Sequence, residues 1–161
     1  MSKKKKEFKN NINIRNKKAR FDYEIVDKYI AGIQLVGTEI KAIREGKAGL
    51  SDSFCEFNDR GELFVVNMYI DEYSHGTHYN HLPKRERKLL LHKQELRKLR
   101  REVERNGMTI VPLRLFITEK GWAKMEIALA RGRKKYDKRQ VLKERDIKRE
   151  LDRVRRAYKT R

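Results

Sequence analysis

Residues 109–129 read TIVPLRLFITEKGWAKMEIAL. The two halves of this stretch, Thr109 to Ile117 and Ala123 to Leu129, are rich in Ile, Leu and Val and flank the turn-forming residues 118–121. This pattern is typical of a β-hairpin. Because Pro112 has no backbone donor, we expect the first strand to lie at a sheet edge or to carry a bulge there.

Further strands are predicted on the N-terminal side of this hairpin. Ser53 to Phe57 and Leu63 to Tyr69 flank the turn-forming residues 58–61, so they read as another hairpin. Phe21 to Val36 reads as two extended pieces, with a bulge or tight bend expected at Ala31-Gly32.

Two helices are predicted between these strands. Thr38 is expected to cap a short helix that ends at about Arg44. From about Leu89 to Arg105 the apolar residues recur at helical spacing, and Asn106-Gly107 is the stop signal. Residues 71–83 lack a regular apolar pattern and read as a loop.

The predicted elements suit a small β-barrel, for which the OB-fold is the nucleic-acid-binding candidate. We therefore predict a mainly β fold with flanking helices, an OB-like closed barrel over residues 21–130. Residues 1–20 hold nine Lys or Arg against one acidic residue, and residues 131–161 hold fifteen against five. The barrel is nearly neutral, with eighteen basic and seventeen acidic residues, so it lies between two basic arms.

The net charge of +19 makes a polyanion the expected partner, because cations placed on phosphates release condensed counterions. Cys55 is the only cysteine, which excludes an internal disulfide and a multi-cysteine zinc site. No apolar run reaches the roughly 18 residues of a membrane-spanning helix. We expect a cytoplasmic monomer that acts without a membrane, a metal or a cofactor.

The C-terminal arm, residues 131–161, has too little apolar content for a core of its own. It nevertheless has one narrow apolar stripe at helical spacing, formed by Ile147, Leu151, Val154 and Tyr158. An isolated helix of this kind is marginal in water. We expect this arm to be disordered when free and helical on a partner.

Three groups of side chains allow two interpretations each. The basic cluster at 83–88 before the long helix either holds phosphates or is a solvated helix start, while Leu89 and Leu91 fill the core. Trp122 beside Lys124 either stacks on bases or covers the end of the barrel. The dense basic segment 131–139 is an RNA arm or a solubilising tail, and its Arg, Gly and Tyr content favours RNA.

Candidate metal and catalytic residues are few. His75, His78 and His81 lie at intervals of three in a loop, but no carboxylate or cysteine completes a metal site, so loop polarity or RNA contact fits better. His92 is by default a partly buried histidine. The carboxylates and serines match no catalytic pairing, and the glycines match no phosphate-binding loop, so an enzyme is not expected.

Several segments together resemble the SmpB family of proteins that bind transfer-messenger RNA (tmRNA), in order and at fitting spacing. They are Asn16-Lys17-Lys18-Ala19-Arg20, Ala31-Gly32-Ile33, Gly37-Thr38-Glu39-Ile40-Lys41, Arg87-Lys88-Leu89-Leu90-Leu91, Gly132 and Tyr136-Asp137-Lys138-Arg139. The sequence departs from the family at Ile30, where Glu is usual, at Ala42, where Ser is usual, and at Arg133, where Lys is common.

The resemblance implies a protein required for trans-translation, not an enzyme. It would bind the tRNA-like domain of tmRNA and bring it to stalled ribosomes. Its tail would occupy the decoding centre, against small-subunit rRNA, and the empty mRNA channel. Elongation factor Tu and alanyl-tRNA synthetase would be indirect partners through tmRNA. A structural ribosomal protein and an RNA-processing enzyme are the alternatives, and sequencing the co-purifying RNA separates them.

The resemblance also implies the site residues. The tmRNA-binding positions would be Asn16, Lys17, Lys18, Arg20, Gly32, Glu39, Lys41, Arg87, Lys88, Leu90, His92, Lys124, Arg131, Gly132 and Lys134. The ribosome-binding tail positions would be Tyr136, Asp137, Lys138, Arg139, Ile147, Lys148 and Arg149. Glu39 is expected to orient Asn16, Lys41 or another basic side chain, or to accept a hydrogen bond from RNA. Glu39→Ala should then weaken RNA binding and leave the fold intact.

Overall fold

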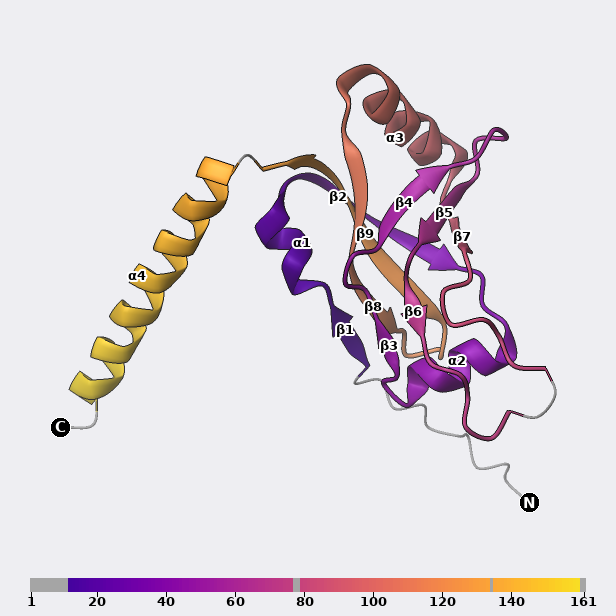
Figure 1. Ribbon diagram of the computed structural model, residues 1–161, viewed down its shortest axis with the longest axis horizontal. Helices are drawn as coiled ribbons and strands as arrows, with labels where there is room; N and C mark the ends of the chain where they lie inside the picture. The colour runs from indigo at the N-terminus through magenta and orange to yellow at the C-terminus, as the bar shows by residue number, and fades with distance from the viewer. Residues whose placement is uncertain (1–11, 77–78, 134, 160–161) are drawn as a thin grey trace.

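The computed structural model describes residues 12–76, 79–133 and 135–159. The elements are, in order, β1 (Asn13–Arg15), α1 (Lys17–Asp22), β2 (Tyr23–Ile33), α2 (Gly37–Arg44), β3 (Ala48–Gly49), β4 (Phe54–Phe57), β5 (Leu63–Val66), β6 (Tyr69–Ile70), β7 (Arg87–Leu90), α3 (Lys93–Asn106), β8 (Thr109–Ile117), β9 (Ala123–Gly132) and α4 (Lys135–Lys159). Helix α3 lies across one end of the strands, α2 lies at the other end, and α4 stands apart (Figure 1).

Six strands close into a ring. They pair in the order β8, β4, β5, β7, β2 and β9, and β9 pairs again with β8. Strand β1 pairs with β8 at Arg114 to Phe116, and the short strands β3 and β6 form a separate pair. The ring with helices at its ends confirms the prediction of a mainly β, closed fold.

The hairpin at residues 109–129 is present as β8 and β9, joined by a tight turn in which Gly121 has a φ of +87°. The register shifts between Pro112 and Arg114, which confirms the predicted bulge. The strand lies inside the sheet, with β1, β4 and β9 as partners. Its inward side chains, with those of β9, supply much of the core.

Strand β2 is continuous, so the predicted break at Ala31-Gly32 is wrong. Gly32 pairs with Leu90 on β7 and with Lys124 on β9, and partners on both sides keep its backbone extended. The irregularity of this strand lies instead between Ile25 and Asp27, where the register to β9 shifts.

Both predicted helices are present, with different starts. Helix α2 begins at Gly37, one residue before Thr38, so Thr38 is not the cap that the sequence predicted. Instead, the Glu39 carboxylate accepts the backbone N–H of Val36 at 3.0 Å. Helix α3 begins at Lys93 because Leu89 belongs to strand β7. Its predicted end is confirmed, since Gly107 adopts the left-handed conformation with a φ of +60°.

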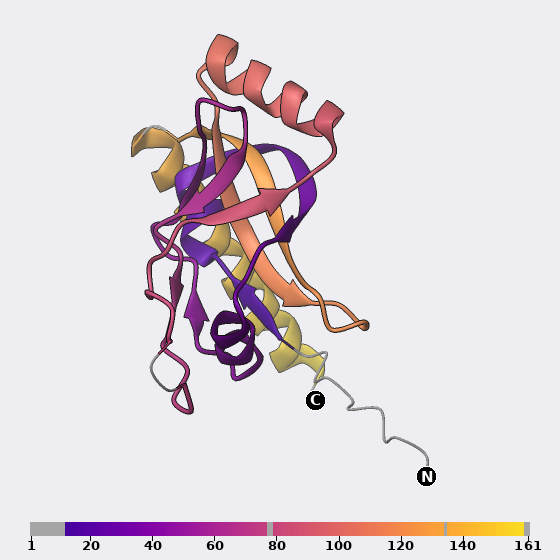
Figure 2. The ribbon, with the colours of Figure 1, turned by 90° about the vertical axis from the view of Figure 1, so that its right-hand side faces the viewer.

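The second hairpin is confirmed as β4 and β5, although β5 is shorter than predicted. It ends at Val66 because Asn67 adopts a left-handed backbone with a φ of +64°. The chain then forms β6, which pairs with β3 outside the ring. Figure 2 shows α3 crossing above the end of β4, β5 and β7, and there Leu99 of α3 is fully buried.

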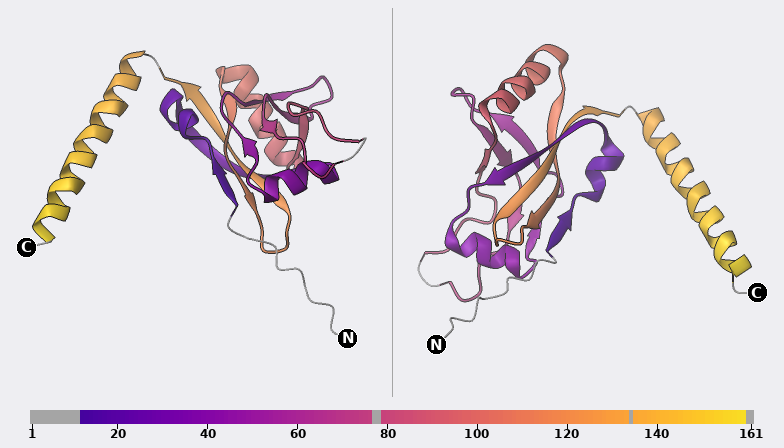
Figure 3. Two further views of the ribbon diagram at one scale, coloured as in Figure 1. Left: turned by 60° about the horizontal axis from the view of Figure 1, so that its bottom comes forward. Right: turned by 180° about the vertical axis from the view of Figure 1, so that it is seen from behind.

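The two arms differ in how they meet the barrel. Residues 13–22 form β1 and α1, which pack on β8, so the folded body begins before residue 21. Helix α4 projects away from the strands in both views of Figure 3. Its base is held at Asp22, whose backbone oxygen accepts the N–H of Arg133 at 2.9 Å and whose carboxylate lies 3.2 Å from Lys138 Nζ. Disorder of this arm in free solution stays a prediction.

No helix among the described residues is long and apolar enough to cross a membrane.

Candidate nucleic-acid interface

One row of residues crosses three neighbouring strands. Gly32 is the register partner of Leu90 on β7 and of Lys124 on β9. A Cβ atom at Gly32 would lie 3.3 Å from Leu90 Cβ, so the absence of a side chain lets Leu90 lie close over the strand. The structure thereby brings together three of the positions predicted to bind RNA, with Leu90 46% exposed.

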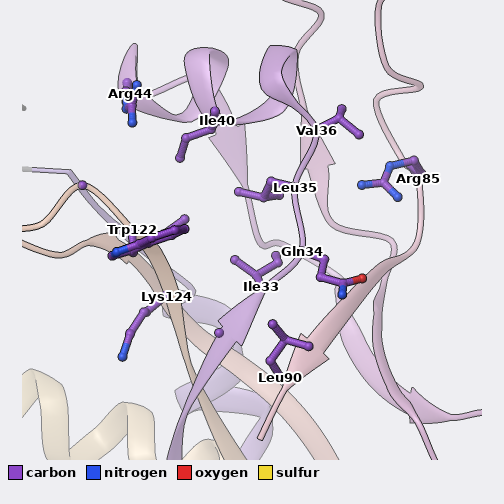
Figure 4. A pocket seen from close by; sticks show the side chains of 13 residues that line it. Ile33, Gln34, Leu35, Val36, Ile40, Arg44, Arg85, Leu90, Trp122 and Lys124 are labelled. Carbon is purple, nitrogen blue, oxygen red and sulfur yellow. The ribbon is translucent and has the colours of Figure 1, made fainter.

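A hollow of about 710 Å³ opens beside this row, between residues 33–36, helix α2 and the tip of the β8–β9 hairpin. Figure 4 shows Trp122, Lys124 and Arg44 on one side of it and Arg85 on the other. None of the described lining residues is acidic. Trp122 is 69% exposed and lines the hollow, which favours stacking on bases over cover of the barrel end. An exposed ring among cations suits base stacking next to phosphate contacts.

Glu39 and Arg87 form a fully buried ion pair under this face. The Glu39 carboxylate accepts Arg87 Nε–H on one oxygen and Arg85 Nη2–H, at 2.5 Å, on the other. Arg87 also donates to the backbone oxygens of Met68 at 2.8 Å and Pro83 at 3.1 Å. Glu39 therefore positions the Arg85 guanidinium at the rim of the hollow, as predicted for "another basic side chain".

Burial alone would raise the pKa of Glu39, but the hydrogen bonds from Arg85, from the Val36 backbone and from Arg87 outweigh it. The pKa is held below its ordinary value of 4.5. The ionised carboxylate is therefore stabilised by folding. Its contribution is fully present above the unfolded-state pKa and is lost as the pH falls through the lower, folded-state pKa.

We therefore expect the free energy of unfolding to fall as the pH drops below about 4.5. Urea unfolding from about pH 3 to pH 7 measures this, with the Glu39→Gln variant as the comparison. The variant lacks the titrating group, so its stability should change less steeply over this range. Parallel curves for the two proteins would contradict the assignment.

Two further predicted residues are internal. Asn16 is 5% exposed, and its Nδ2 donates to the backbone oxygens of Leu50 at 3.2 Å and Pro112 at 3.0 Å. Its Oδ1 accepts the N–H of Ala19 and so caps α1. Asn16 thus fixes α1 to the barrel. Arg87 is 0% exposed, which contradicts a direct contact of this side chain with RNA.

The remaining basic residues of the first motif lie on α1, away from the hollow. Lys17, Lys18 and Arg20 are exposed, and Lys18 Nζ lies 2.7 Å from Asp52 Oδ1. A smaller hollow of about 230 Å³ is lined by this part of α1 and by residues 52–54. These cations therefore form a separate surface.

Other predicted positions are distributed around the barrel. Lys41 is exposed on α2, with its Nζ 5.5 Å from the centre of the Tyr73 ring. His92 is exposed before α3, so its expected partial burial is wrong. Arg131 and Gly132 are exposed at the end of β9. Lys134 lies outside the described residues.

The tail positions lie along α4. For Tyr136 and Asp137 the structure places the backbone in the first turn. Lys138 is the residue paired with Asp22, and its Nζ lies 5.9 Å from the Phe21 ring centre. The other predicted tail residues are exposed along the helix: Arg139, Ile147, Lys148 and Arg149.

The histidine loop is not a metal site in the part that is described. His81 is 6% exposed and is held by Thr38 Oγ1 at 2.9 Å and the backbone oxygen of Ile70 at 3.0 Å. The ring of His75 packs edge-on against Tyr73. His78 lies outside the described residues. Within these limits, no group of three potential ligands comes together.

Arg44 and Arg85 line the hollow without having been singled out from the sequence. Arg85 belongs to the basic cluster at 83–88, but nothing in that run distinguishes it from Arg87, which is buried. Ile30, one of the departures from the SmpB pattern, is exposed opposite Glu126 on β9.

The closed ring of strands, the cationic hollow with an exposed aromatic and the basic helical arm are typical of a nucleic-acid-binding β-barrel protein. The chain belongs to the SmpB family, described as SmpB protein, whose sequence model matches residues 13–157.

Individual relatives match almost the whole chain. The SsrA-binding protein of Christiangramia forsetii is 62% identical and is covered over 96% of its length, with 94% of this chain aligned. That of Flavobacterium johnsoniae is 59% identical over 91% of this chain and 97% of its own. A chain from the solved structure "tmRNA-SmpB: a journey to the center of the bacterial ribosome" is similar, with a TM-score of 0.64 and 49% identity over 77% of this chain and 86% of the other.

Proposed function

We propose that this chain binds the tRNA-like domain of tmRNA and delivers it to stalled bacterial ribosomes for trans-translation. Membership of the SmpB family, relatives named SsrA-binding protein and the likeness to a chain of a tmRNA–SmpB structure support this proposal. Elongation factor Tu and alanyl-tRNA synthetase take part through the RNA. The protein acts in the cytoplasm as a monomer, and no step requires it to catalyse a reaction.

The observation that carries the proposal is the hollow beside the Leu90–Gly32–Lys124 row. Its lining cations can hold the RNA backbone, and Leu90 and Trp122 offer apolar surface to an unstacked base. Arg85 is held in place by a buried carboxylate, so it reaches the RNA in a fixed geometry. Recognition rests on RNA shape more than on base sequence. Most of these groups are cations that contact phosphates, and phosphates are the same at every base.

The test is the double variant Leu90→Ala/Lys124→Ala and a transcript of the tRNA-like domain. We expect affinity to fall about tenfold or more, from one lost phosphate contact and one lost apolar contact. The slope of log K against log salt should become shallower by about 1. Thermal stability should hardly change, because both side chains are exposed.

The matched control is Leu82→Ala/Arg101→Ala. These residues are also an exposed leucine and an exposed cation, and neither lines the hollow. Its affinity and salt slope should equal those of the wild type. Wild-type binding by Leu90→Ala/Lys124→Ala would overturn the assignment of this face. A wild-type chain that co-purifies with every ribosome and without tmRNA would overturn the proposed function itself.

A further inference from the structure

A third hollow, of about 470 Å³, lies on the other side of Leu90, and we call it the α3 groove. Its walls are the turn between β4 and β5, strand β7 and the first two turns of α3. Figure 2 shows α3 passing above these strands. Leu90 lines both this groove and the hollow that carries the proposed function, so the two hollows adjoin at this side chain.

The α3 groove is strongly cationic. Five basic residues line it, against Glu62 alone: Arg60, Lys88, Lys93, Arg97 and Arg100. Glu62 is 2.5 Å from Lys88 Nζ, so its charge is already neutralised by one of them. The remaining cations give the groove a net positive charge that no lining carboxylate offsets.

These cations reach the groove from separate elements. Gly61, with a φ of +77°, lets the β4–β5 turn approach α3, and a Cβ there would lie 2.9 Å from Arg100 Nη1. The Arg100 Nε–H donates to the Glu104 carboxylate at 2.9 Å, and this bond orients the guanidinium. Lys93 and Arg97, one helical turn apart, make no ion pair among the described residues. Their charges are therefore free for an anionic ligand.

We propose that the α3 groove holds a phosphodiester segment of the same RNA that binds the hollow beside Leu90. Several cations around one concave surface suit a polymeric anion better than a single phosphate. The shared residue Leu90 allows one RNA backbone to pass from one hollow into the other. This inference rests on the proposed function and extends it to Arg60, Lys93, Arg97 and Arg100, none of which belongs to the motifs of the SmpB resemblance.

The first experiment compares Lys93→Gln/Arg97→Gln with Arg101→Gln/Arg105→Gln. Both variants remove two cations four residues apart on the same helix, but Arg101 and Arg105 are exposed outside the groove. With the tRNA-like transcript, we expect the groove variant to lose about tenfold in affinity. Its salt slope should become shallower by about 1.4 to 1.8, the value for two lost phosphate contacts. The control should keep the wild-type slope.

The second experiment locates the RNA directly. Cys55 is buried, and burial raises the pKa of its thiol, so a new surface cysteine can be modified selectively. An iron chelate attached at Gln94→Cys, beside Lys93, cleaves nearby nucleotides by hydroxyl radicals. The same chelate at Ser51→Cys, an exposed turn residue outside the groove, is the control. We expect one contiguous segment to be cut from position 94 and left intact from position 51.

Equal affinity and equal salt slopes for the two α3 variants would overturn the groove proposal, as would no specific cleavage from position 94 in a bound complex. In both cases the wild-type chain binds the transcript, so these outcomes contradict the groove proposal and not the proposed function. If the wild-type chain does not bind the transcript at all, the proposed function fails first, and the groove proposal fails with it.

Discussion

Glu39→Ala is expected to lower the free energy of unfolding by about 3 to 5 kcal/mol, the usual effect of leaving a buried charge without its partner. The fully buried Arg87 would keep only backbone oxygens as acceptors, and Arg85 would lose the group that positions it. This expectation corrects the one drawn from sequence, in which Glu39→Ala leaves the fold intact. The correction follows from the exposure of Glu39, which is 0%.

Urea unfolding measures this effect, and Glu45→Ala is the matched control. Glu45 follows the same helix and pairs with Lys47 at the surface, so its loss should cost less than about 1 kcal/mol. The double variant Glu39→Leu/Arg87→Met replaces the buried pair with apolar side chains of similar size and should recover much of the stability. A Glu39→Ala protein as stable as the wild type would contradict the role of the pair.

The β-hairpins and the end of α3 are predictable from sequence because their signals are local. Residues 109–129 alternate strand-forming runs with a turn, and Gly107 stops the helix where a left-handed residue is needed. The start of α3 is not predictable in this way. Leu89 fits a helical apolar pattern equally well, but pairing with Leu63 on β5 and Ile33 on β2 places it in a strand.

The continuity of β2 depends on its neighbours in the same manner. Gly32 favours a bend in an isolated chain, and only strands on both sides keep it extended. Strand β1 is equally hard to predict, because its short sequence is held by pairing with β8 about a hundred residues later.

The sequence predicts which residues belong to the candidate site, but it does not predict the role of each. Gly32, Leu90 and Lys124 are far apart in sequence, and the register of β7, β2 and β9 brings them together. Arg85 and Arg87 differ by two positions in one basic run, yet one lines the hollow and the other is buried. Both pair with Glu39, which is 46 and 48 residues away, so the basic run alone does not show either role.

A chain that ends at Lys135 should bind the tRNA-like domain and reach ribosomes normally but fail to tag nascent peptides. The truncation removes α4, whose contacts with the body are near its base, at α1. It removes no residue of the core. The partly exposed ion pair between Lys138 and Asp22 is worth little, so stability should change by less than about 1 kcal/mol. RNA affinity, ribosome association and tagging, measured on both chains, test the prediction.

Tagging should require the C-terminal arm because a stalled ribosome offers no codon to pair with an anticodon. Another group must therefore occupy its decoding centre and mRNA channel. Residues 131–161 carry fifteen cations and five acidic groups, and Lys135–Lys159 of this arm form one long helix, α4. Phosphate contacts on the ribosome would offset the cost of ordering it.

Charge alone does not explain the apolar stripe on α4. Ile147, Leu151, Val154 and Tyr158 are all exposed on the free chain, so they gain burial only against a partner. Replacing these four with Gln keeps the net charge and most of the helix propensity. If the helix must pack against rRNA, this variant should lose tagging as the truncated chain does, although its charge is unchanged. Normal tagging by the truncated chain would show that the whole arm is a solubilising appendage. Normal tagging by the Gln variant alone would show that the cations suffice and that the stripe has no part in ribosome rescue.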